Sequence, residues 1–299
     1  MKSFHTALAA ALLLSVAAPA VATDITVRNF SGTIEISEGP AGLEVVRQGS
    51  RGDLDYRQAD GDIVIDGGLS KDDRKDVCNG PGGSWNLTIG NWNSSNDTRL
   101  EDYPHLAIRV PAGSDLDVED STLRLSSDVA LGTAQLDIEG CFDTDLSDVD
   151  LLIVEKSGAG DLDVGNVGRF EIEKAGAGDI DAGIVDEFEL EQSGAGDIMI
   201  ELVTGRATID KSGAGDVEID EMDGDLTVEK SGAGDLDVGG GDVPNLTVRN
   251  SGAGDVDIDA AVGNAFIRAS GAGDVFVESI SGSLDESTSG AASFSRGDD

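Results

Sequence analysis

The residues with the clearest chemical potential are aspartates that recur at near-constant spacing. They end the motif Ser-Gly-Ala-Gly-Asp or its close variant, at Asp161, Asp179, Asp197, Asp216, Asp235, Asp255 and Asp274. Carboxylate oxygens are ligands that Ca²⁺ prefers, and the ion takes several of them at about 2.4 Å. The row therefore suggests stacked calcium sites, although the calcium-binding nonapeptide repeat spaces glycine and aspartate differently. In the alternative interpretation, each aspartate accepts hydrogen bonds from turn amides and needs no ligand.

Three aromatic residues form a second candidate site, this one for a partner. Trp85, Trp92 and Tyr103 lie in a stretch rich in Asn, Ser, Gly and Asp that runs from Gly67 to Pro104. Such side chains can stack on a sugar or anchor a partner protein. Alternatively, they cover one end of the fold. The partners expected from the first interpretation are a cell-surface or envelope protein, or a glycan.

Catalytic chemistry has little support in this sequence. Of the two histidines, one lies in the first 22 residues and the other is His105, which excludes a zinc site with two histidines and disfavours a histidine-based triad. No Gly-Lys-Ser/Thr phosphate loop is present. We therefore expect no enzyme activity and no cofactor apart from calcium. A β-helix polysaccharide-active enzyme is the strongest enzymatic alternative.

The net charge limits the partners further. The chain has 59 acidic and 20 basic residues, for a formal charge of -39. Phosphate groups are bound through Lys and Arg, so this charge disfavours nucleic acid and anionic membranes as partners.

All of these residues must be positioned by an internal repeat. Copies of the five-residue motif start at Ser157, Ala175, Ser193, Ser212, Ser231, Ser251 and Ser270, and a broken copy starts at Ser289. A fixed period near 19 residues is typical of stacked coils rather than of a globular domain.

The residues between the motifs alternate between apolar and polar, as in Leu162-Asp163-Val164 and Val217-Glu218-Ile219. This period of two predicts strands with one buried face, and no segment shows a helical period. Equivalent strands of successive coils must then lie parallel and side by side. The predicted fold is all-β: a single-stranded β-helix, or β-solenoid, with coils of about 19 residues and right-handed crossovers.

The turn and its flanks have their own predictions. Glycine supplies the positive φ that a tight turn requires, and alanine is small enough for turns to stack. A second outward row of acids follows the motif, at Asp163, Asp181, Glu218, Asp237 and Asp257. Lysines directly precede the motif at Lys156, Lys174, Lys211 and Lys230, and we expect them to pair with the aspartates.

Four segments are predicted along the chain. Residues 1–22 combine an early lysine, an apolar run and the end Ala20-Val21-Ala22, which is typical of a secretory signal peptide. Residues 23–110 form irregular β coils with an insertion at 67–104, residues 111–289 form the regular repeats, and residues 290–299 form a polar tail. We expect an exported protein, periplasmic or extracellular, without an integral membrane segment; the oligomeric state stays open.

The two cysteines, Cys78 and Cys141, are expected to form a disulfide in an oxidising compartment. Two buried free thiols are the alternative.

The Ser-Gly-x-Gly-Asp units on short alternating strands, behind a signal peptide, resemble a bacterial domain called "putative auto-transporter adhesin, head GIN domain". Related β-strand-repeat domains of unknown function share the pattern. The resemblance covers about Leu106 to Ser289 and implies a β-helix and an adhesin-like role. It supplies no catalytic residues. We expect an exported protein that acts by surface contact, as an adhesin or an envelope scaffold.

Overall fold

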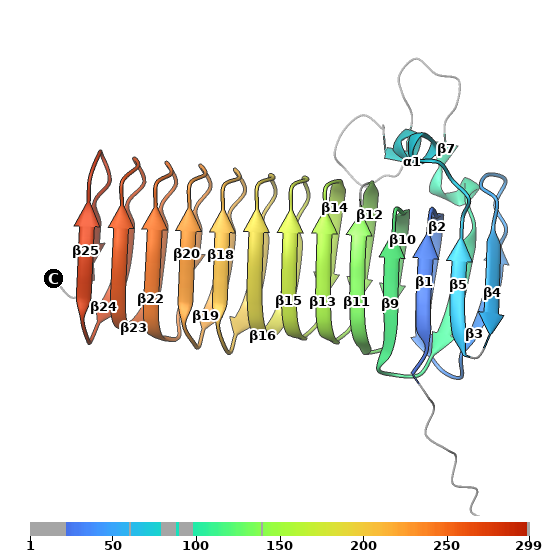
Figure 1. Ribbon diagram of the computed structural model, residues 1–299, viewed down its shortest axis with the longest axis horizontal. Coiled ribbons are helices and arrows are strands. Elements are labelled where there is room, and N and C mark those ends of the chain that lie inside the picture. The colour runs from blue at the N-terminus through green and yellow to red at the C-terminus, as the bar shows by residue number, and fades with distance from the viewer. Residues whose placement is uncertain (1–21, 60, 79–87, 90–97, 139, 298–299) are drawn as a thin grey trace, which may run out of the picture.

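The computed structural model describes residues 22–59, 61–78, 88–89, 98–138 and 140–297. Its strands wind into a solenoid with two long sheets that extend along the molecule and face each other across the core (Figure 1). Neighbouring strands within each sheet are parallel throughout the repeats. The predicted β-solenoid is therefore confirmed, with coils that advance by 18 to 20 residues.

The first sheet contains the strands that precede each Gly-Ala-Gly turn. Its order is β4 (Asp55–Ala59), β5 (Asp62–Asp66), β1 (Asp24–Arg28), β9 (Ser114–Glu119), β11 (Leu131–Ile138), β13 (Val149–Lys156), β15 (Val167–Lys174), the end of β16 (Ile180–Gln192), β18 (Ala207–Lys211), β20 (Leu226–Lys230), β22 (Asp242–Asn250), the end of β23 (Val256–Ala269) and β25 (Leu284–Thr288).

The second sheet contains the strands that follow the turn. Its order is β3 (Gly42–Arg47), β8 (His105–Val110), β2 (Ser31–Glu38), β10 (Thr122–Ser127), β12 (Cys141–Leu146), β14 (Ala159–Val164), the start of β16, β17 (Ile198–Val203), β19 (Val217–Met222), β21 (Leu236–Val238), the start of β23, β24 (Val275–Ile280) and β26 (Phe294–Arg296).

The alternating apolar residues fill the space between the sheets. In one coil Phe170 and Ile172 point inward from the first sheet, Ile180 points inward from the second, and Val185 closes the far corner, all buried. The equivalent residues of neighbouring coils stack in register, as Phe170 does with Phe188. Since full burial of one such side chain contributes about 1.5 to 3 kcal/mol, the continuous aliphatic column is the main source of stability.

The glycines of the turn are required by the closeness of the coils. A Cβ on Gly215 would lie 1.9 Å from the carbonyl oxygen of Gly196 in the preceding coil. Positive φ, which the sequence predicts for these turns, is found at Gly196 (89°) but not at Gly215. Close backbone approach is thus the more general reason for glycine here.

The N-terminal coils are stacked out of sequence order. Strands β1 and β2 pair with β9 and β10 on one side, and with β5 and β8 on the other. The chain therefore starts inside the stack, runs outward to its end, and returns past its own first coil. At that end β3 pairs with β8, and β4 pairs with β5, in antiparallel orientation, so each sheet ends on an antiparallel strand.

The predicted insertion is partly helical, which the sequence pattern did not indicate. It contains α1 (Lys71–Cys78), a 3₁₀ turn (Leu100–Asp102), and the short pair β6 (Thr88–Ile89) and β7 (Thr98–Arg99). The Ser70 hydroxyl accepts the N–H of Asp73 at 3.3 Å and donates to its carboxylate at 2.6 Å, which caps the helix.

Arg74 attaches this helix to the solenoid. It is buried and donates to Asn29 at 3.0 Å and to Asp120 at 2.9 Å. A short polar helix has no apolar stripe to reveal it, and its position depends on these tertiary bonds.

The predicted start of the polar tail, at residue 290, lies too early in the chain. Residues 294–296 form β26, which pairs with β24, so the solenoid continues into this segment. All five residues of β25 are exposed, and its Leu284 is 36% exposed although it is aligned with the buried Ala265.

Candidate functional site

The predicted aspartate row forms a continuous ladder along the second sheet. A carboxylate oxygen of Asp235 accepts the backbone N–H of Asp255, the equivalent residue of the next coil, at 2.8 Å. The same bond recurs at 2.7 to 2.9 Å from Asp161 to Asp274. These side chains therefore join successive coils, and the amides that they bind belong to the next coil rather than to their own turn.

At the end of the ladder the partner changes. Ser293 donates its hydroxyl and its N–H to Asp274, both at 2.8 Å, and these bonds lower the pKa of Asp274. Its carboxylate is thus held in the ionised form, which is the form that accepts both bonds.

Calcium binding by the ladder stays a prediction. Within the described residues, no group of three or more His, Cys, Asp or Glu side chains is arranged to hold a metal ion. One carboxylate oxygen of each ladder residue already accepts a backbone N–H, as Asp216 does from Asp235. Calcium takes six to eight oxygen ligands, and this bonding leaves fewer of them to the ladder.

The lysines that precede the motif point into the protein, not toward the aspartates as predicted. Lys156, Lys174, Lys211 and Lys230 are at most 2% exposed and stack in one inner corner of the solenoid. Gln192 and Asn250 occupy the same column. The alternation of the strand decides this, because the lysine lies two residues after an inward apolar residue.

The inner corner gives most of these side chains a backbone partner. Lys156 donates to the carbonyl of Gly160, Lys174 donates to Ala195 and, at 3.1 Å, to Gly196, and Lys230 donates to Gly254. Lys211 has no hydrogen-bond partner. Lys156, Lys174 and Lys230 therefore donate hydrogen bonds to turn carbonyls from inside the solenoid. The aspartates accept hydrogen bonds from turn amides on the outside.

Burial changes the proton affinity of the corner. Desolvation, together with the neighbouring charge of Lys174, lowers the pKa of Lys156 to about 8. Burial also lowers the pKa of Lys174, Lys211 and Lys230, and the ladder aspartates oppose this shift. The aspartates thus act on the lysines through their field rather than through direct ion pairs.

The second acidic row differs from the ladder. It contains Asp145, Asp163, Asp181, Glu218, Asp237 and Asp257, and it is interrupted by the exposed Met199. Desolvation and then the neighbouring carboxylates raise the pKa of Asp163, Asp237 and Asp257. Neighbouring carboxylates of the row repel one another, and an open depression of about 460 Å³ near Met199 is lined by three of them, Asp145, Asp163 and Asp181.

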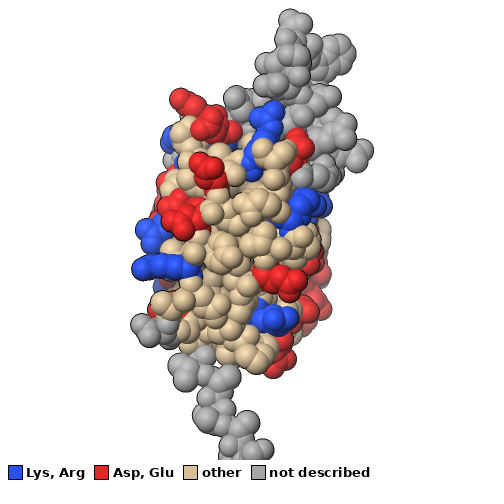
Figure 2. Space-filling view, turned by 90° about the vertical axis from the view of Figure 1, so that its right-hand side faces the viewer, with Lys and Arg blue, Asp and Glu red and all other residues tan. Residues whose placement is uncertain are grey.

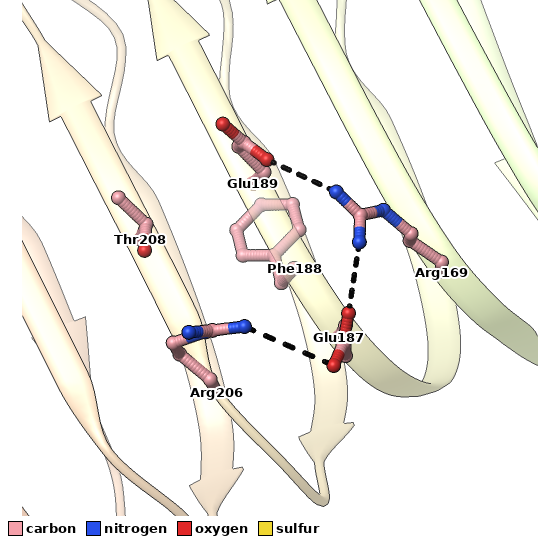
Figure 3. Close-up of a pocket in the computed structure, with 6 residues that line it drawn as sticks. All are labelled: Arg169, Glu187, Phe188, Glu189, Arg206 and Thr208. Atoms are coloured by element: carbon pink, nitrogen blue, oxygen red, sulfur yellow. Dashed lines mark hydrogen bonds and ion pairs between the residues drawn. The ribbon is translucent and has the colours of Figure 1, made fainter.

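One group of arginines lies on the outer surface of the first sheet, in β15 and just before β18. Arg169 contacts Glu187 at 3.1 Å and Glu189 at 3.5 Å, and Arg206 contacts Glu187 at 3.9 Å. Figure 3 shows these side chains around an open depression of about 280 Å³, above the buried Phe188. Every member of this pair network has a partner of opposite charge within the network.

A second group of arginines lies nearer the C-terminal end of the same sheet. Arg249 and Arg268 are directly in register on neighbouring strands. Both lie against the ring of Phe266, with their guanidinium carbons 5.2 and 3.9 Å from its centroid. Sequence reasoning missed this group, although alternation places Phe266 and both arginines on the outer face.

At the N-terminal end of the solenoid, uncharged residues lie between scattered acidic and basic side chains (Figure 2). Val46 and Tyr56 are 53% and 48% exposed on β3 and β4. Tyr103, a predicted partner-binding residue, is only 4% exposed, so its ring packs inside and presents no surface to a partner. The other two, Trp85 and Trp92, lie outside the described residues.

Cys141 is disulfide-bonded. Cys78 is the other cysteine of the sequence. Because the side chain of Cys78 lies outside the described residues, the Cys78–Cys141 bridge stays a prediction. Such a bridge would attach the end of α1 to the second sheet.

Comparison with known proteins identifies the family of the chain. The family model described as "Putative auto-transporter adhesin, head GIN domain" matches residues 86–241 and 183–281. No curated protein matches the chain. No helix of the described part is long and apolar enough to cross a bilayer.

Two crystal structures align along most of the chain. A putative adhesin from Bacteroides fragilis has 11% identity and a TM-score of 0.30, with 93% of this chain and 94% of that chain covered. A putative cell adhesion protein from Clostridium sporogenes has 12% identity and a TM-score of 0.19, with 93% and 92% covered. The family match, taken together, spans residues 86–281, which is more than half of the sequence. The chain belongs to the family described as "Putative auto-transporter adhesin, head GIN domain".

Proposed function

We propose that the protein is an exported, non-enzymatic adhesin or envelope scaffold that acts by surface contact. The observation that carries this proposal is the rigid display of side chains on two open sheets. Each coil is joined to the next through its backbone and through the aspartate ladder. Outward residues therefore stand in fixed rows, which suits repeated weak contacts to an extended surface.

The surface chemistry supports contact rather than catalysis. Three depressions on the described part of the solenoid are open to solvent, with volumes of about 280 to 490 Å³. A polysaccharide-active enzyme would need a walled cleft that isolates two carboxylates with different pKa values. Here carboxylates such as Asp163 and Asp237 stand in a uniform row and share the same direction of pKa shift.

Cell fractionation and a binding assay test this proposal. We expect the mature chain to be found outside the cytoplasm, and the purified chain to bind the outer surface or an envelope fraction saturably. A double variant, Trp85→Ala with Trp92→Ala, tests the predicted aromatic site at constant chain length. Deletion of residues 67–104 is the coarser variant, with its melting temperature as the control for folding. Cytoplasmic location, or no saturable binding to any cell fraction, would overturn the proposal.

A divalent-cation module is the second candidate, favoured by the unneutralised second acidic row. Calcium would offset the repulsion that raises the pKa of Asp163 and Asp257. Calorimetry with calcium, against a chelated control, decides between specific binding and screening. Unchanged heat and an unchanged melting temperature would remove this candidate.

A further inference from the structure

We propose that the arginine pair Arg249 and Arg268 forms, with the serines of the adjacent turns, a binding site for a sugar that carries a carboxylate or sulfate. The inference deepens the proposed adhesive function and rests on it, because it names a ligand class for one face of the solenoid.

The charge changes sign along one outer row of the first sheet. On the first sheet Asp210, Glu229, Arg249, Arg268 and Ser287 follow one another in register. The row is acidic up to Glu229 and then carries two arginines on neighbouring strands, about 4.8 Å apart. Like charges at this spacing repel, so an anion that bridges them would be stabilised by both.

The two guanidinium groups are already oriented by their neighbours. Phe266 lies against both, and Arg268 is also held by a bidentate contact to the Asp285 carboxylate at 3.1 Å. Arg249 makes one described hydrogen bond, to the carboxylate of Glu229 at 3.3 Å. Arg268 also donates to the backbone oxygens of Ile267 at 2.9 Å and Asp285 at 3.1 Å, so its Nε–H is the donor that no described hydrogen bond uses. Arg249, whose side chain is 50% exposed, has further donors beyond its one described bond. A guanidinium presents five donors in a fixed plane, which matches carboxylate and sulfate oxygens.

The depression beside the arginine pair has a lining that suits a charged sugar. It measures about 490 Å³ and combines the two arginines with carboxylates and hydroxyls; its other polar lining residues include Asp210, Glu229, Ser231, Ser251 and Ser270. Guanidinium groups suit the anionic group of a sugar, and the carboxylates and hydroxyls suit its hydroxyl groups. The volume is sufficient for one or two sugar rings.

A sugar fits this place better than an acidic peptide. Strands β22 and β23 lie within the sheet, and their backbone groups are used in parallel pairing on both sides. An extended peptide could therefore not add itself as a strand. A long polyanion would also be repelled by the net charge of -39, whereas a sugar with one charged group contacts only this site.

The experiment uses the full mature chain and separate probes. Calorimetry or ligand-observed NMR would be run with glucuronate, galactose 6-sulfate, neutral glucose and a short acidic peptide. The test variant is Arg249→Gln with Arg268→Gln, and the matched control is Arg169→Gln with Arg206→Gln on the same sheet. Melting temperatures of both variants establish that they fold.

We expect at least one of the two anionic sugars to bind saturably, at least tenfold more tightly than glucose. The test variant should lose at least tenfold in affinity, and the control variant should stay within about twofold of the wild type. Preference for glucuronate or for the sulfated sugar then identifies the anionic group. Binding of the peptide alone, no binding of either anionic sugar, or equal binding by the test variant would overturn the inference.

The adhesive function is measured separately from sugar binding. If the wild type binds an anionic sugar but no cell surface, the site stands and the proposed function fails. If cell binding is intact while neither anionic sugar binds, the site fails alone.

Discussion

Two rows of acidic residues run side by side on the second sheet, two residues apart in most coils, and they have opposite effects on stability. In the ladder, Asp235 accepts the N–H of Asp255, the equivalent aspartate of the next coil. In the neighbouring row, Asp237 has a raised pKa because burial and the adjacent carboxylates disfavour its charge. The same residue type thus stabilises the stack in one row and opposes it in the other.

The difference shows that the local backbone, and not the charge, decides the role of an aspartate. A ladder residue ends the turn, where the amide of the next coil is within reach of its side chain. A residue of the second row follows one inward apolar residue and points away from the sheet. The first row is therefore part of the fold, and the second row is available for contacts with cations or partners.

The largest effect should come from separating the coils. In Gly215→Ala the new Cβ would lie 1.9 Å from the carbonyl oxygen of Gly196, so the turns must move apart and the adjacent ladder bonds must lengthen. We expect a loss of about 3 kcal/mol in the free energy of unfolding. Gly240→Ala is the control, because its nearest contact is 3.8 Å away. Equal melting temperatures for the two variants would show that turn stacking does not support the ladder.

A direct test compares Asp235→Ala with Asp237→Ala. The first removes the acceptor of the Asp255 N–H and should cost about 1 to 2 kcal/mol in urea denaturation. The second relieves repulsion and should change stability by at most about 0.5 kcal/mol. Asp235→Asn should recover part of the loss, since its amide oxygen can accept the same bond. Equal losses at both positions would contradict the distinction between the rows.

The buried lysines behind the ladder sharpen the comparison. Lys211→Met removes a buried, unpartnered ammonium and should raise stability by about 1 kcal/mol. Lys174→Met removes the donor to the carbonyls of Ala195 and Gly196 and should lower stability by about 1 kcal/mol. Thermal unfolding of the pair measures both changes. A shift of the same sign in both variants would show that hydrogen bonding does not distinguish the lysines.

The smallest expected effect is a pH dependence with stability lowest near neutral pH. Because the pKa of Asp163, Asp237 and Asp257 is raised in the folded state, the folded protein takes up protons first as the pH falls toward 3.8, and stability rises. Because the pKa of Lys156 is lowered to about 8, the folded protein loses its proton first between that pH and 10.5, and stability again rises.

Urea denaturation across this pH range measures both limbs. Asp237→Asn should flatten the acid limb, and Lys156→Met should flatten the alkaline limb. A stability maximum at neutral pH in the wild type would show that other groups outweigh these four residues.

The sequence by itself determined the period, the strands and the identity of the inward apolar residues. Alternation such as Val217-Glu218-Ile219 permits one buried face, and a repeat near 19 residues permits one way of stacking it. The aspartate row and its outward position followed from the same pattern. These features are local, so each repeat specifies them independently.

Only the tertiary structure decided what each charged residue contacts. The hydrogen bond from Asp255 to Asp235, the inward lysines at the corner, and the register of Arg249 with Arg268 all depend on how one coil lies on the next. The order of the N-terminal strands was equally hidden, because β1 pairs with β5 and β9, which are distant in the chain. Contacts between coils join residues about 19 or more positions apart, and no local pattern of residue types specifies their geometry.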